Sequence, residues 1–579
     1  ENTFISGGSV SNFYQDNPDI LFHLQHMDLE QVIRLKEQEF AEHGIYAHAP
    51  RDMPDALDNY HLVLDIVGGI AGDFVAPRAD EVDREGARFV NGQVHYAQGT
   101  KQSLERLAQA DVMGFTLPRQ YGGINMPKTI YSMAIEMISR ADASLMNLFG
   151  LQEIADTICK FGTSEQKERF LPRFCSGETS GAMALTEPDA GSDLQSVTLR
   201  AEQRDDGQWV LNGVKRFITN GCADVSLVMA RSEPGISGGR GVSLFIYERD
   251  ERMRIRRIED KLGIHGSPTC ELQFQDAPAE LLGQRKKGLV KYTISLMNGA
   301  RLGVAAQAVG IAEAAWREAR EYARQRVQFG QPIDRFHAVS EMLADMQVSI
   351  QAGRSLLYET SRMVDIKEGL EELAERDAEQ AKEYKETLKR YTRYSALFTP
   401  LVKAYTSEVA NDICDMALQI HAGTGYTKDF PVERLYRDAR ITNIYEGTTQ
   451  LQVVAAIGGI MTGTIFDWID TVEQSRDFSP LSWQLEMARQ CKEALQDAVE
   501  RIKERGDSSF QEFHARRVVD MAAECSMAYL VTRDALHSDS KKILANLFLS
   551  RAVQRVTTWR DMIQNQDQIW FEQARSLVG

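Results

Sequence analysis

The sequence predicts a mainly α-helical protein that contains a small β domain. Before about residue 175 and again after Val290, apolar residues recur at the spacing of three to four that is typical of helices with one buried face. Between about Thr179 and Leu282, glycine, proline and β-branched residues become more frequent. With 579 residues, of which 43% are hydrophobic, the chain is long enough for about three or four domains and is not globally disordered.

Helices are expected in several segments of the N-terminal part. The apolar positions predict helices over 32–42, 57–74, 103–114, 133–140 and 145–161, and a short helix that begins at Ser164. After Val290, helices are expected to continue to the end of the chain. Segment 365–390 is rich in Glu, Lys and Arg and has little apolar periodicity, which predicts a solvated helix or helical hairpin projecting from a bundle. An arm that binds another molecule is the alternative for this segment.

Runs of strand-forming residues mark the β domain. In Trp209–Thr219, Asn212-Gly213 lies between two apolar runs, which predicts a hairpin with a tight turn. Val225–Ala230, Val242–Tyr247 and Cys270–Phe274 are further strand candidates. A small β domain set between helical parts follows from this pattern.

Charge and cysteine usage exclude several classes of protein. The net charge of −17 disfavours nonspecific binding to nucleic acids or anionic lipids. No apolar run reaches the ~18 residues of a membrane-spanning helix, and the acidic residues near the start suit neither a signal peptide nor a transit peptide. The seven cysteines form no CxxC pair, which predicts reduced thiols in a cytoplasmic protein. No histidine pair has metal-ligand spacing, so no metal site is expected.

The most informative short segment is Ile444–Gln450, which places one carboxylate, Glu446, between Tyr445 and Gly447. An apolar run, Leu451–Ile460, follows it. Desolvation raises the pKa of a carboxyl group towards the range of a proton acceptor, so Glu446 is a candidate base for removing a proton from carbon. Taken alone, a glutamate before a helix is more often a cap or a solvated charge.

Two segments of the β domain are candidate ligand-binding loops. In Met183–Asp193, turn-forming residues follow an apolar strand, and such a loop presents N–H groups and hydroxyls to a planar or anionic ligand. In Phe217–Gly221, an aromatic side chain beside a hydroxyl could cover a heteroaromatic ring. A surface turn and an ordinary strand end are the alternatives, and they are favoured for each segment taken alone.

A further candidate lies after the β domain, in Tyr322–Ile333. Arg326 and Phe329 are three residues apart, which places them on one helix face just before Gly330 and Pro332 end the helix. Arginine can bind a pyrophosphate bidentately, and phenylalanine can pack on an adenine or ribose. The alternative is a surface arginine and a core phenylalanine.

The fourth candidate begins with Leu418–Tyr426 and runs through Arg434–Asp438 to Glu446. Its glycines, Gly423 and Gly425, permit close approach of the backbone to a ligand. The histidine between these segments, His421, is interpreted as structural rather than catalytic.

Taken together, these segments resemble the acyl-CoA dehydrogenase family. The matching stretches are TEPDAGSD, FITNG, KLGIHGSPTCEL, YARQRVQFGQPI, QIHAGTGY and IYEGTTQ, in the order of the family over about residues 60–460. The stretch Gly114–Gly123 is similar to part of the family's N-terminal domain. The N-terminal extension, the charged segment and the C-terminal helices exceed the minimal family. They resemble its large subgroup, which includes very-long-chain acyl-CoA and methylthiopropanoyl-CoA dehydrogenases.

The resemblance implies a mainly α fold with a central β-barrel. The implied domains are an N-terminal extension and helical domain over 1–177, a β-barrel over 178–288, a four-helix bundle over 289–461 with the charged insertion 365–390, and an extra C-terminal helical domain over 462–579. Because flavin contacts in the family come from two subunits, a homodimer or a higher oligomer is also implied.

The resemblance also implies an FAD enzyme that introduces a 2,3-double bond into an acyl-CoA thioester. The family's usual base position falls on Glu446, which takes the α-proton while a β-hydride passes to flavin N5. A minority of the family places its base immediately before the arginine matched by Arg301, but that position is Ala300 here and cannot accept a proton. Electrons would pass to an electron-transfer flavoprotein. The acyl chain is left open, and an acyl-CoA oxidase or a noncatalytic flavin-binding relative is the alternative.

The binding residues implied by the resemblance form two sets. The FAD-binding positions are Met183, Leu185, Thr186, Gly191, Ser192, Phe217, Thr219, Arg326, Phe329, Gln419, Gly423, Thr448 and Gln450. The substrate-binding positions are Ser192, Asn298, Arg301, Tyr445 and Gly447. Three positions depart from the residues common in the family: Met183 is often aromatic, Phe217 is often Trp, and Asn298 is often Asp.

Overall fold

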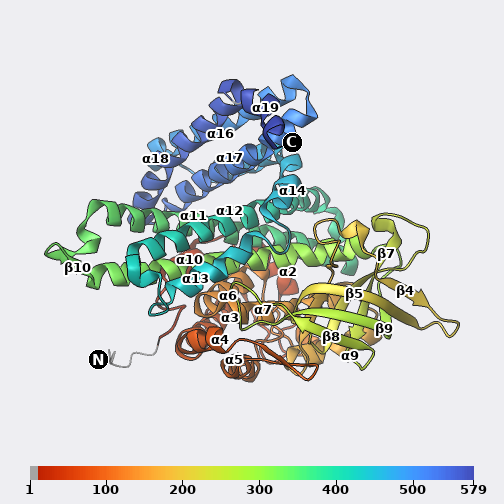
Figure 1. Cartoon of the computed structure of the whole chain (residues 1–579). Coiled ribbons are helices and arrows are strands. Elements are labelled where there is room, and N and C mark those ends of the chain that lie inside the picture. Colours follow the sequence, from red (N-terminus) through yellow and green to blue (C-terminus); the bar gives the residue numbers. More distant parts are fainter. Residues whose placement is uncertain (1–10, 567, 579) are drawn as a thin grey trace. The chain divides into compact units, whose positions relative to one another are not determined.

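The computed structural model describes residues 11–566 and 568–578, which form two compact units. The first unit contains the described residues up to Leu21, the long stretch Lys36–Gly303 and the short segment Glu433–Ile441. The second unit contains Phe22–Leu35, Val304–Val432 and the described residues from Thr442 onward. Figure 1 labels the helices and strands of both units.

The helices of the first unit include one, α6 (Lys128–Ala141), that is almost entirely buried. They are α3 (Met53–Gly69), α4 (Ala79–Glu85), α5 (Gln98–Gln109), α6, α7 (Ala143–Gly150), α8 (Ile154–Phe161) and α9 (Ser164–Cys175), and a small hairpin joins β1 (Arg88–Val90) to β2 (Gln93–His95). Nearly every residue of α6 is buried, and α6 packs against both α3 and α7. The expected helices are therefore confirmed in this region, with 145–161 divided into α7 and α8. Helix α9 begins at Ser164 because Thr163 and Gln166 form a capping box.

The helix expected over 32–42 is shorter than predicted. The chain forms α1 (Pro18–His26) and α2 (Glu30–Lys36), and φ is positive at Gln38, Glu39 and Phe40. Glu37 is buried, and its carboxylate accepts hydrogen bonds of 2.8 and 3.1 Å from the guanidinium of Arg119. This buried ion pair draws the chain out of the helical path, which apolar spacing alone could not show.

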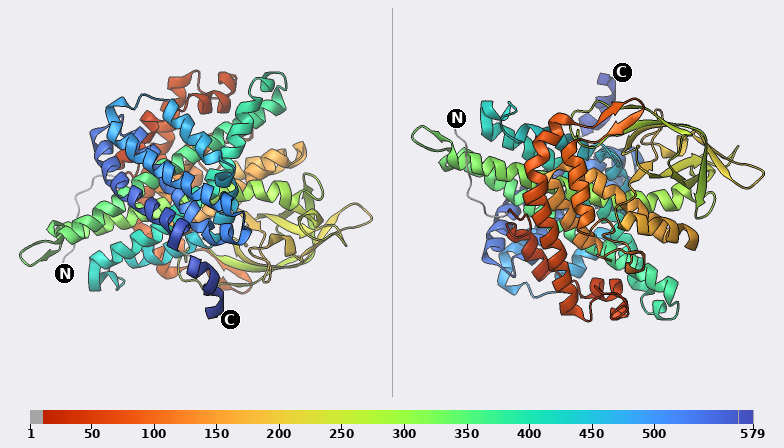
Figure 2. Two further views of the ribbon diagram at one scale, coloured as in Figure 1. Left: turned by 90° about the horizontal axis from the view of Figure 1, so that it is seen from above. Right: turned by 90° about the horizontal axis from the view of Figure 1, so that it is seen from below.

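A closed β-barrel follows the first helices. Its strands are β3 (Gly181–Ala184), β4 (Arg200–Gln203), β5 (Trp209–Thr219), β6 (Val225–Arg231), β7 (Val242–Glu248), β8 (Met253–Ile258) and β9 (Thr269–Leu282). The ring runs β4–β5–β9–β7–β6 and closes where β6 meets β4 at the pair Arg200 and Arg231, while β3 pairs with β6 and β8 with β9. The yellow and yellow-green strands curve round in both views of Figure 2. Apolar side chains fill the barrel interior, and a second apolar layer packs the barrel against α8 and α9.

The hairpin predicted at Asn212-Gly213 is wrong, because β5 is one continuous strand. A register shift against β9 lies between Leu211 and Gly213, and Gly213 has a φ of 143°. A Cβ at position 213 would lie 3.0 Å from the Cα of Leu199. The glycine therefore serves a β-bulge and a close backbone approach rather than a turn. The other three predicted strands are confirmed as parts of β6, β7 and β9.

Long helices dominate the second unit. They are α11 (His337–Arg376), α12 (Lys385–Gly425), α14 (Thr449–Met461), α15 (Thr464–Gln474), α16 (Ser482–Arg505), α17 (Ser508–Asp534), α18 (Asp539–Asp561) and α19 (Gln568–Val578). Two further helices belong partly to the first unit: α10 (Ile294–Gln325) begins in it, and α13 (Val432–Ala439) lies almost wholly in it. Helix α12 packs against α11 and α14, and α16, α17 and α18 pack against one another. Figure 1 shows this last group in blue.

The charged segment 365–390 forms the end of α11 and the beginning of α12, so the predicted helical hairpin is confirmed. One face of it is not solvated, because Ile366, Leu370 and Leu373 are buried. Leu35 lies so close to this face that a Cβ at Gly369 would be 2.7 Å from the Leu35 Cβ. The apolar spacing of three and four was present in the sequence but was obscured by the surrounding charges.

Among the residues that the structure describes, no single helix is long and apolar enough to span a membrane. Helices α14 and α15 reach that length and apolar composition only when they are taken together, and the pair is bent by 67°. The same residues contain no group of three or more His, Cys, Asp or Glu side chains placed to hold a metal ion.

Candidate functional site

A buried ion pair shapes the loop that follows β3. The Lys215 ammonium donates hydrogen bonds to the Leu185 carbonyl (2.8 Å) and to the Glu187 carboxylate (2.9 Å), and the two side chains are 0% and 4% exposed. The carboxylate also accepts hydrogen bonds from the backbone N–H groups of Thr198 (2.7 Å) and Leu199 (3.0 Å). The loop Leu185–Asp193 is therefore anchored to β5 at its first residues.

The charges of this pair are strongly perturbed. Burial lowers the pKa of the Lys215 ammonium to about 8, although Glu187 opposes the shift. Burial raises the pKa of the Glu187 carboxyl, but Lys215 and the N–H groups of Thr198 and Leu199 outweigh burial and hold it below its usual range. Each group stabilises the charge of the other, so neither can be removed without cost.

Phe217 is presented at the barrel surface by a second bulge in β5. The register between β5 and β9 shifts between Lys215 and Ile218, and Phe217 has a φ of 60° and is 51% exposed. The N–H of Arg216 donates to the Thr186 carbonyl (3.0 Å), which brings the loop after β3 beside Phe217. A non-glycine residue at positive φ and an exposed aromatic ring are both uncommon, and bulges often direct a side chain towards a site.

The remaining predicted positions of the first unit lie around this point or on α10. Met183, Thr186 and Thr219 are half-buried, Leu185 is buried, and Gly191 and Ser192 are exposed. A Cβ at Gly191 would lie 3.7 Å from the Thr186 side chain, so these two positions are neighbours. Asn298 and Arg301 lie on α10, where the guanidinium donates to the Asn298 side-chain oxygen (3.2 Å). The barrel thus brings Thr186, Gly191 and the β5 bulge at Phe217 together.

Glu446 lies in a strained segment between the short helix Arg440–Asn443 and α14. Its φ is 54° and that of Gly447 is 90°. A non-glycine residue in this region costs about 1–3 kcal/mol and persists only where its surroundings impose it. The N-cap of α14 is Thr448 rather than Glu446, which leaves the glutamate outside the usual capping position.

Two side chains impose this conformation by binding backbone carbonyls. The buried ammonium of Lys403 donates to the Gly447 carbonyl (2.7 Å). The side-chain amide of Gln452 donates to the carbonyls of Gly447 (2.8 Å) and Glu446 (3.2 Å). The hydroxyl of Tyr445 donates to the side-chain oxygen of Gln307. The segment is therefore held from α10, α12 and α14, with the half-buried Glu446 at its centre.

The segment that follows α10 differs from its prediction. Arg326 and Phe329 do not share a helix face, because α10 ends at Gln325 and β10 (Val327–Gln328) pairs with β11 (Gln331–Pro332) in a tight hairpin. Phe329 is at the tip of this hairpin, with a φ of 51° and 95% of its surface exposed. Arg326 at the base of the hairpin is also exposed. The Phe-Gly pair supplies the positive φ values that the tight turn needs.

The end of α12 carries two other predicted positions, Gln419 and Gly423, both exposed. Ala422 departs from helical geometry with φ 53° and ψ −135°, and no atom lies within 4 Å of a Cβ placed on Gly423. The buried ring of His421 stacks on Tyr322 at 4.3 Å, and its Nδ1 lies 2.8 Å from the Ala417 carbonyl. Burial lowers the pKa of His421 and so disfavours its charged form, which supports its interpretation as a structural residue.

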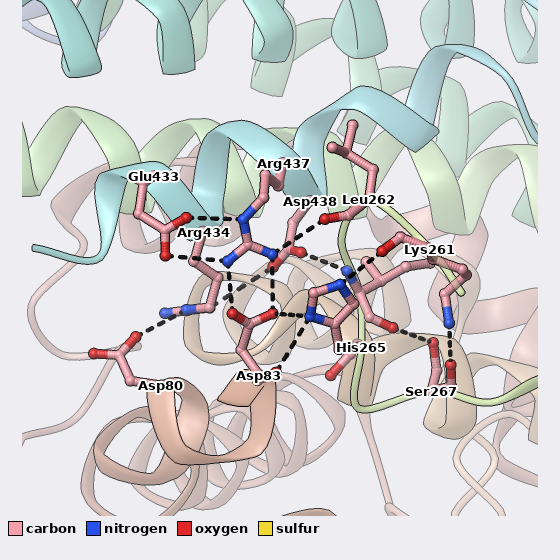
Figure 3. A network of polar contacts seen from close by, with 12 residues as sticks. Asp80, Asp83, Lys261, Leu262, His265, Ser267, Glu433, Arg434, Arg437 and Asp438 are labelled. Carbon is pink, nitrogen blue, oxygen red and sulfur yellow. Dashed lines mark hydrogen bonds and ion pairs between the residues drawn. The ribbon is translucent and has the colours of Figure 1, made fainter. Parts of the chain in front are cut away.

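The first unit also contains a polar network that joins the predicted segment Arg434–Asp438 to distant residues, and we name it the Asp83 cluster: Asp80, Asp83, His265, Arg434, Arg437 and Asp438. Figure 3 shows Asp83 between the imidazole of His265 and the guanidinium of Arg437, at 2.8 and 2.6 Å. The Asp438 carboxylate accepts the N–H of Ile264 (2.6 Å). These contacts join α4, the loop before β9 and α13. Helix α13, which carries Arg434, Arg437 and Asp438, is followed closely in the sequence by Glu446, five residues after Ile441.

The pKa shifts of Asp83, His265 and Asp438 describe the charge balance of the Asp83 cluster. The pKa of Asp83 is held well below its usual range, because hydrogen bonds and charge from His265 and Arg437 outweigh burial. The hydrogen bond to Asp83 raises the pKa of His265. Burial raises the pKa of Asp438 to about 6, although Arg434 and the Ile264 N–H oppose the shift. The cluster is therefore most favourable when His265 carries its proton.

A His265→Gln variant tests this electrostatic account. Because the folded-state pKa of His265 is raised, its contribution to stability is complete below the ordinary histidine value of about 6.5 and is lost as pH rises through the folded value. The difference in urea midpoint between wild type and variant is expected to be largest near pH 6 and to shrink towards pH 9. A difference that is constant over this range would show that His265 acts only through packing.

Family models for acyl-CoA dehydrogenase domains match successive parts of the chain. The N-terminal domain matches residues 58–178, the middle domain 182–277 and the C-terminal domain 288–457. The chain belongs to the acyl-CoA dehydrogenase family. A further model, for the acyl-CoA dehydrogenase C terminal, matches residues 461–568 and shows that this acyl-CoA dehydrogenase has the extra C-terminal region. The expected family and fold class are confirmed.

Individual acyl-CoA dehydrogenases and related chains are also similar to this one. The 3-methylmercaptopropionyl-CoA dehydrogenase of Ruegeria pomeroyi is 33% identical over 433 residues, which cover 69% of this chain and 70% of that one. A crystal structure of an acyl-CoA dehydrogenase from Bacillus anthracis, complexed with FAD, matches with a TM-score of 0.73 at 25% identity and covers 87% of this chain and 88% of that one. A chain from the structural work on the electron transferring flavoprotein of Acidaminococcus fermentans matches with a TM-score of 0.60 at 33% identity, covering 69% and 97%.

Several residues of this acyl-CoA dehydrogenase that hold the Glu446 segment or form the Asp83 cluster were not predicted. Lys403 is a single charge in an apolar stretch of α12, and Gln452 is a polar residue in the apolar run after Glu446. Asp83 and Arg437 are 354 positions apart, so no local pattern connects them. Each of these side chains binds a backbone carbonyl or an opposite charge that only the folded chain brings close to it.

Proposed function

We propose that this member of the acyl-CoA dehydrogenase family is an FAD-dependent dehydrogenase of an acyl-CoA thioester, in which Glu446 removes the α-proton to give a 2,3-enoyl-CoA. The observation that carries the proposal is the conformation of Glu446, a non-glycine residue at a φ of 54° in a segment held by Lys403 and Gln452. Strained backbone of this kind is concentrated at functional sites. The small Ala300 offers no competing base on α10.

The barrel surface fits a flavin. Phe217 is an exposed aromatic ring fixed by a bulge at positive φ, next to the half-buried loop after β3. In this proposal Met183, Leu185, Thr186, Gly191 and Ser192 would contact the flavin, and Phe217 and Thr219 would cover it and hydrogen-bond to it. When bound, the flavin supplies the acceptor for the hydride that leaves the β-carbon.

The chain's own residues supply the proton chemistry. The α-proton of a thioester is weakly acidic, so the negative charge that develops on the thioester oxygen needs a fixed hydrogen-bond donor. The backbone N–H of Glu446 is suited to this role, because Lys403 and Gln452 fix the adjoining peptide groups through their carbonyls. The Glu446 carboxylate accepts the proton, while Tyr445 and Gly447 border the reacting carbons. Exclusion of water by the acyl chain keeps the carboxylate basic.

The other predicted positions have roles at the far ends of the two ligands. Ser192, Asn298 and Arg301 bind the CoA moiety in this proposal. In the same proposal, the ADP part of FAD would be held by Arg326, Phe329, Gln419, Gly423, Thr448 and Gln450. Phe329, Val327 and Tyr426 are 95%, 53% and 86% exposed in the single chain, as expected of side chains that a second copy covers. A homodimer is therefore the smallest assembly proposed.

Electrons from the flavin are proposed to pass to an electron-transfer flavoprotein, consistent with the similarity to the Acidaminococcus fermentans chain. To test the reaction, FAD-loaded protein is incubated with a panel of acyl-CoA thioesters, either with electron-transfer flavoprotein under nitrogen or in air without it. Mass spectrometry of the enoyl-CoA product and an assay for peroxide are the readouts. Product is expected with the flavoprotein partner and little peroxide in air. Equal turnover in air with peroxide would indicate an oxidase, and no product in either arm would contradict the proposal.

A further inference from the structure

Two imidazole rings stack where helix α1 ends. His26 is the last residue of α1, and His537 lies in the turn between α17 and α18. Their ring centroids are 4.6 Å apart, and the ring planes differ by 20°. Both residues belong to the second unit, although α1 begins in the first. His26 is half-buried and His537 is exposed, so protons from the solvent have access to the pair.

Further contacts hold the last two turns of α1. The ring of Phe22 lies 4.7 Å from that of His26 and 6.5 Å from that of His537, measured between centroids. The buried His23 has its Nε2 3.3 Å from the hydroxyl of Ser355 on α11. The stacked histidines are therefore one part of a larger contact that attaches α1 to the helices of the second unit.

The contact between Arg476 and His537 requires a neutral imidazole. Nη1 of Arg476 lies 3.4 Å from Nε2 of His537. A guanidinium has only donors, so this ring nitrogen must accept with its lone pair and cannot carry a proton. Protonation would turn an N–H towards the guanidinium and would place a positive charge against the ring of His26. Among the residues that the structure describes, no carboxylate forms an ion pair with either stacked ring.

Most charges around His537 oppose its protonation. Partial burial is the largest cause that lowers its pKa, and the charges of His26 and Arg476 are the next. Arg533 on α17 lowers this pKa as well, while Asp534 raises it. The pKa of His537 is therefore below its usual range, in the direction that the hydrogen bond from Arg476 requires.

The nearby carboxylate of Asp534 is engaged by other groups. It accepts hydrogen bonds from the guanidinium of Arg533 (3.0 and 3.1 Å) and from the hydroxyl of Ser355 (2.6 Å). A further cation comes from α18, where the ammonium of Lys541 lies 4.7 Å from the centre of the Phe22 ring. Additional positive charge on the stacked rings would therefore meet more cations than anions.

We propose that the stacked pair of His26 and His537 is an acid-sensitive contact, which holds the end of α1 on the second unit at neutral pH and opens when both rings are protonated. Protonation breaks the hydrogen bond from Arg476 and places like charges on two stacked rings. Because the folded-state pKa of His537 is lowered, its contribution to stability is complete above the ordinary histidine value of about 6.5 and is lost as pH falls through the folded value. His265 in the first unit has the opposite response.

Hydrogen–deuterium exchange of the native, full-length protein tests this inference. Wild-type protein is labelled at pH 7.5 and at pH 5.5, with labelling times corrected for intrinsic exchange, and peptides that cover 18–27 and 533–541 are measured by mass spectrometry. Protection of both peptides is expected to fall about fivefold at pH 5.5, the effect of two like charges in contact at the dielectric constant of water. Peptides from the buried middle of α12, residues 394–407, are expected to keep their protection.

Three variants assign the response to the stacked rings. His537→Phe keeps an aromatic ring but removes the titrating nitrogens, so the loss of protection at pH 5.5 is expected to disappear. In His26→Phe the loss is expected to shrink, because one of the two like charges is missing. His337→Gln is the matched control: it removes an exposed histidine from the first residue of α11 and is expected to keep the wild-type response.

Three results would overturn the inference. Wild-type peptides 18–27 and 533–541 could be equally protected at both pH values, or α12 could lose protection to the same extent as they do. The third result is a His537→Phe protein that keeps the wild-type response. Because the first two results need only wild-type protein, the test stands even if a variant does not fold. None of these measurements depends on whether Glu446 is the base of the reaction.

Discussion

Glu446→Gln is expected to lower kcat for acyl-CoA oxidation by about 10²- to 10⁴-fold, the usual contribution of a positioned general base. A carboxamide has nearly the shape of the carboxylate but does not accept the α-proton at neutral pH. FAD content and acyl-CoA affinity are expected to change little, because the hydrogen bonds from Lys403 and Gln452 to backbone carbonyls of the segment do not depend on the side chain at position 446. Steady-state kinetics, the flavin-to-protein ratio and a binding titration check the three parts of this expectation.

Two further variants separate loss of the base from general damage. Glu446→Asp keeps a base but moves it by about one bond length, so an intermediate kcat is expected. Glu500→Gln removes an exposed carboxylate from α16 in the second unit and is expected to leave kcat unchanged. Glu446→Gln protein that turns over at the wild-type rate would rule out Glu446 as the base.

Lys215→Met is expected to have the largest effect on stability. Glu187 would remain buried at 4% exposure without its cation, and breaking such a pair from one side costs about 3–5 kcal/mol. Because Lys215 also holds the Leu185 carbonyl, the loop that carries Thr186 would loosen, and less FAD is expected per chain. Urea unfolding and the flavin-to-protein ratio after dialysis measure the two effects.

The double variant Lys215→Met with Glu187→Gln is the matched control. Without the carboxylate, no uncompensated charge remains, and the neutral amide can still accept from the N–H groups of Thr198 and Leu199. The double variant is therefore expected to be more stable than Lys215→Met alone. The loss of stability in the double variant, relative to wild type, could instead equal the sum of the losses caused by Lys215→Met and Glu187→Gln separately. That result would show that Lys215 acts through packing rather than through its charge.

Local patterns predicted the class of each region more reliably than its details. Helical spacing located α3, α5 and α6, and β-branched runs located β6, β7 and β9. Asn212-Gly213 was misread as a turn because the same positive φ serves a hairpin and a bulge, and only the packing of Leu199 against Gly213 distinguishes them. Arg326 and Phe329 were misread as helical because the pairing of Val327 with Pro332 is decided two residues beyond the helix end.

The candidate site was predictable where a motif lies in one stretch of chain. Glu446 is such a case, and its positive φ adds a structural reason for singling it out. Lys403, which holds the Gly447 carbonyl, comes from a helix 44 positions away and has no motif of its own. Pocket depth, and with it the acyl chain, depends on side-chain placement that no short pattern specifies.

The most direct test of the central claim is a single turnover without oxygen. Wild-type and Glu446→Gln proteins, both loaded with FAD, are mixed anaerobically with each acyl-CoA thioester of a panel, and the flavin absorbance is followed. The account predicts rapid bleaching of the wild-type flavin by at least one thioester and no comparable bleaching of the variant with the same thioester bound. Wild-type flavin that no member of the panel bleaches, or a variant that bleaches as fast as wild type, would contradict it.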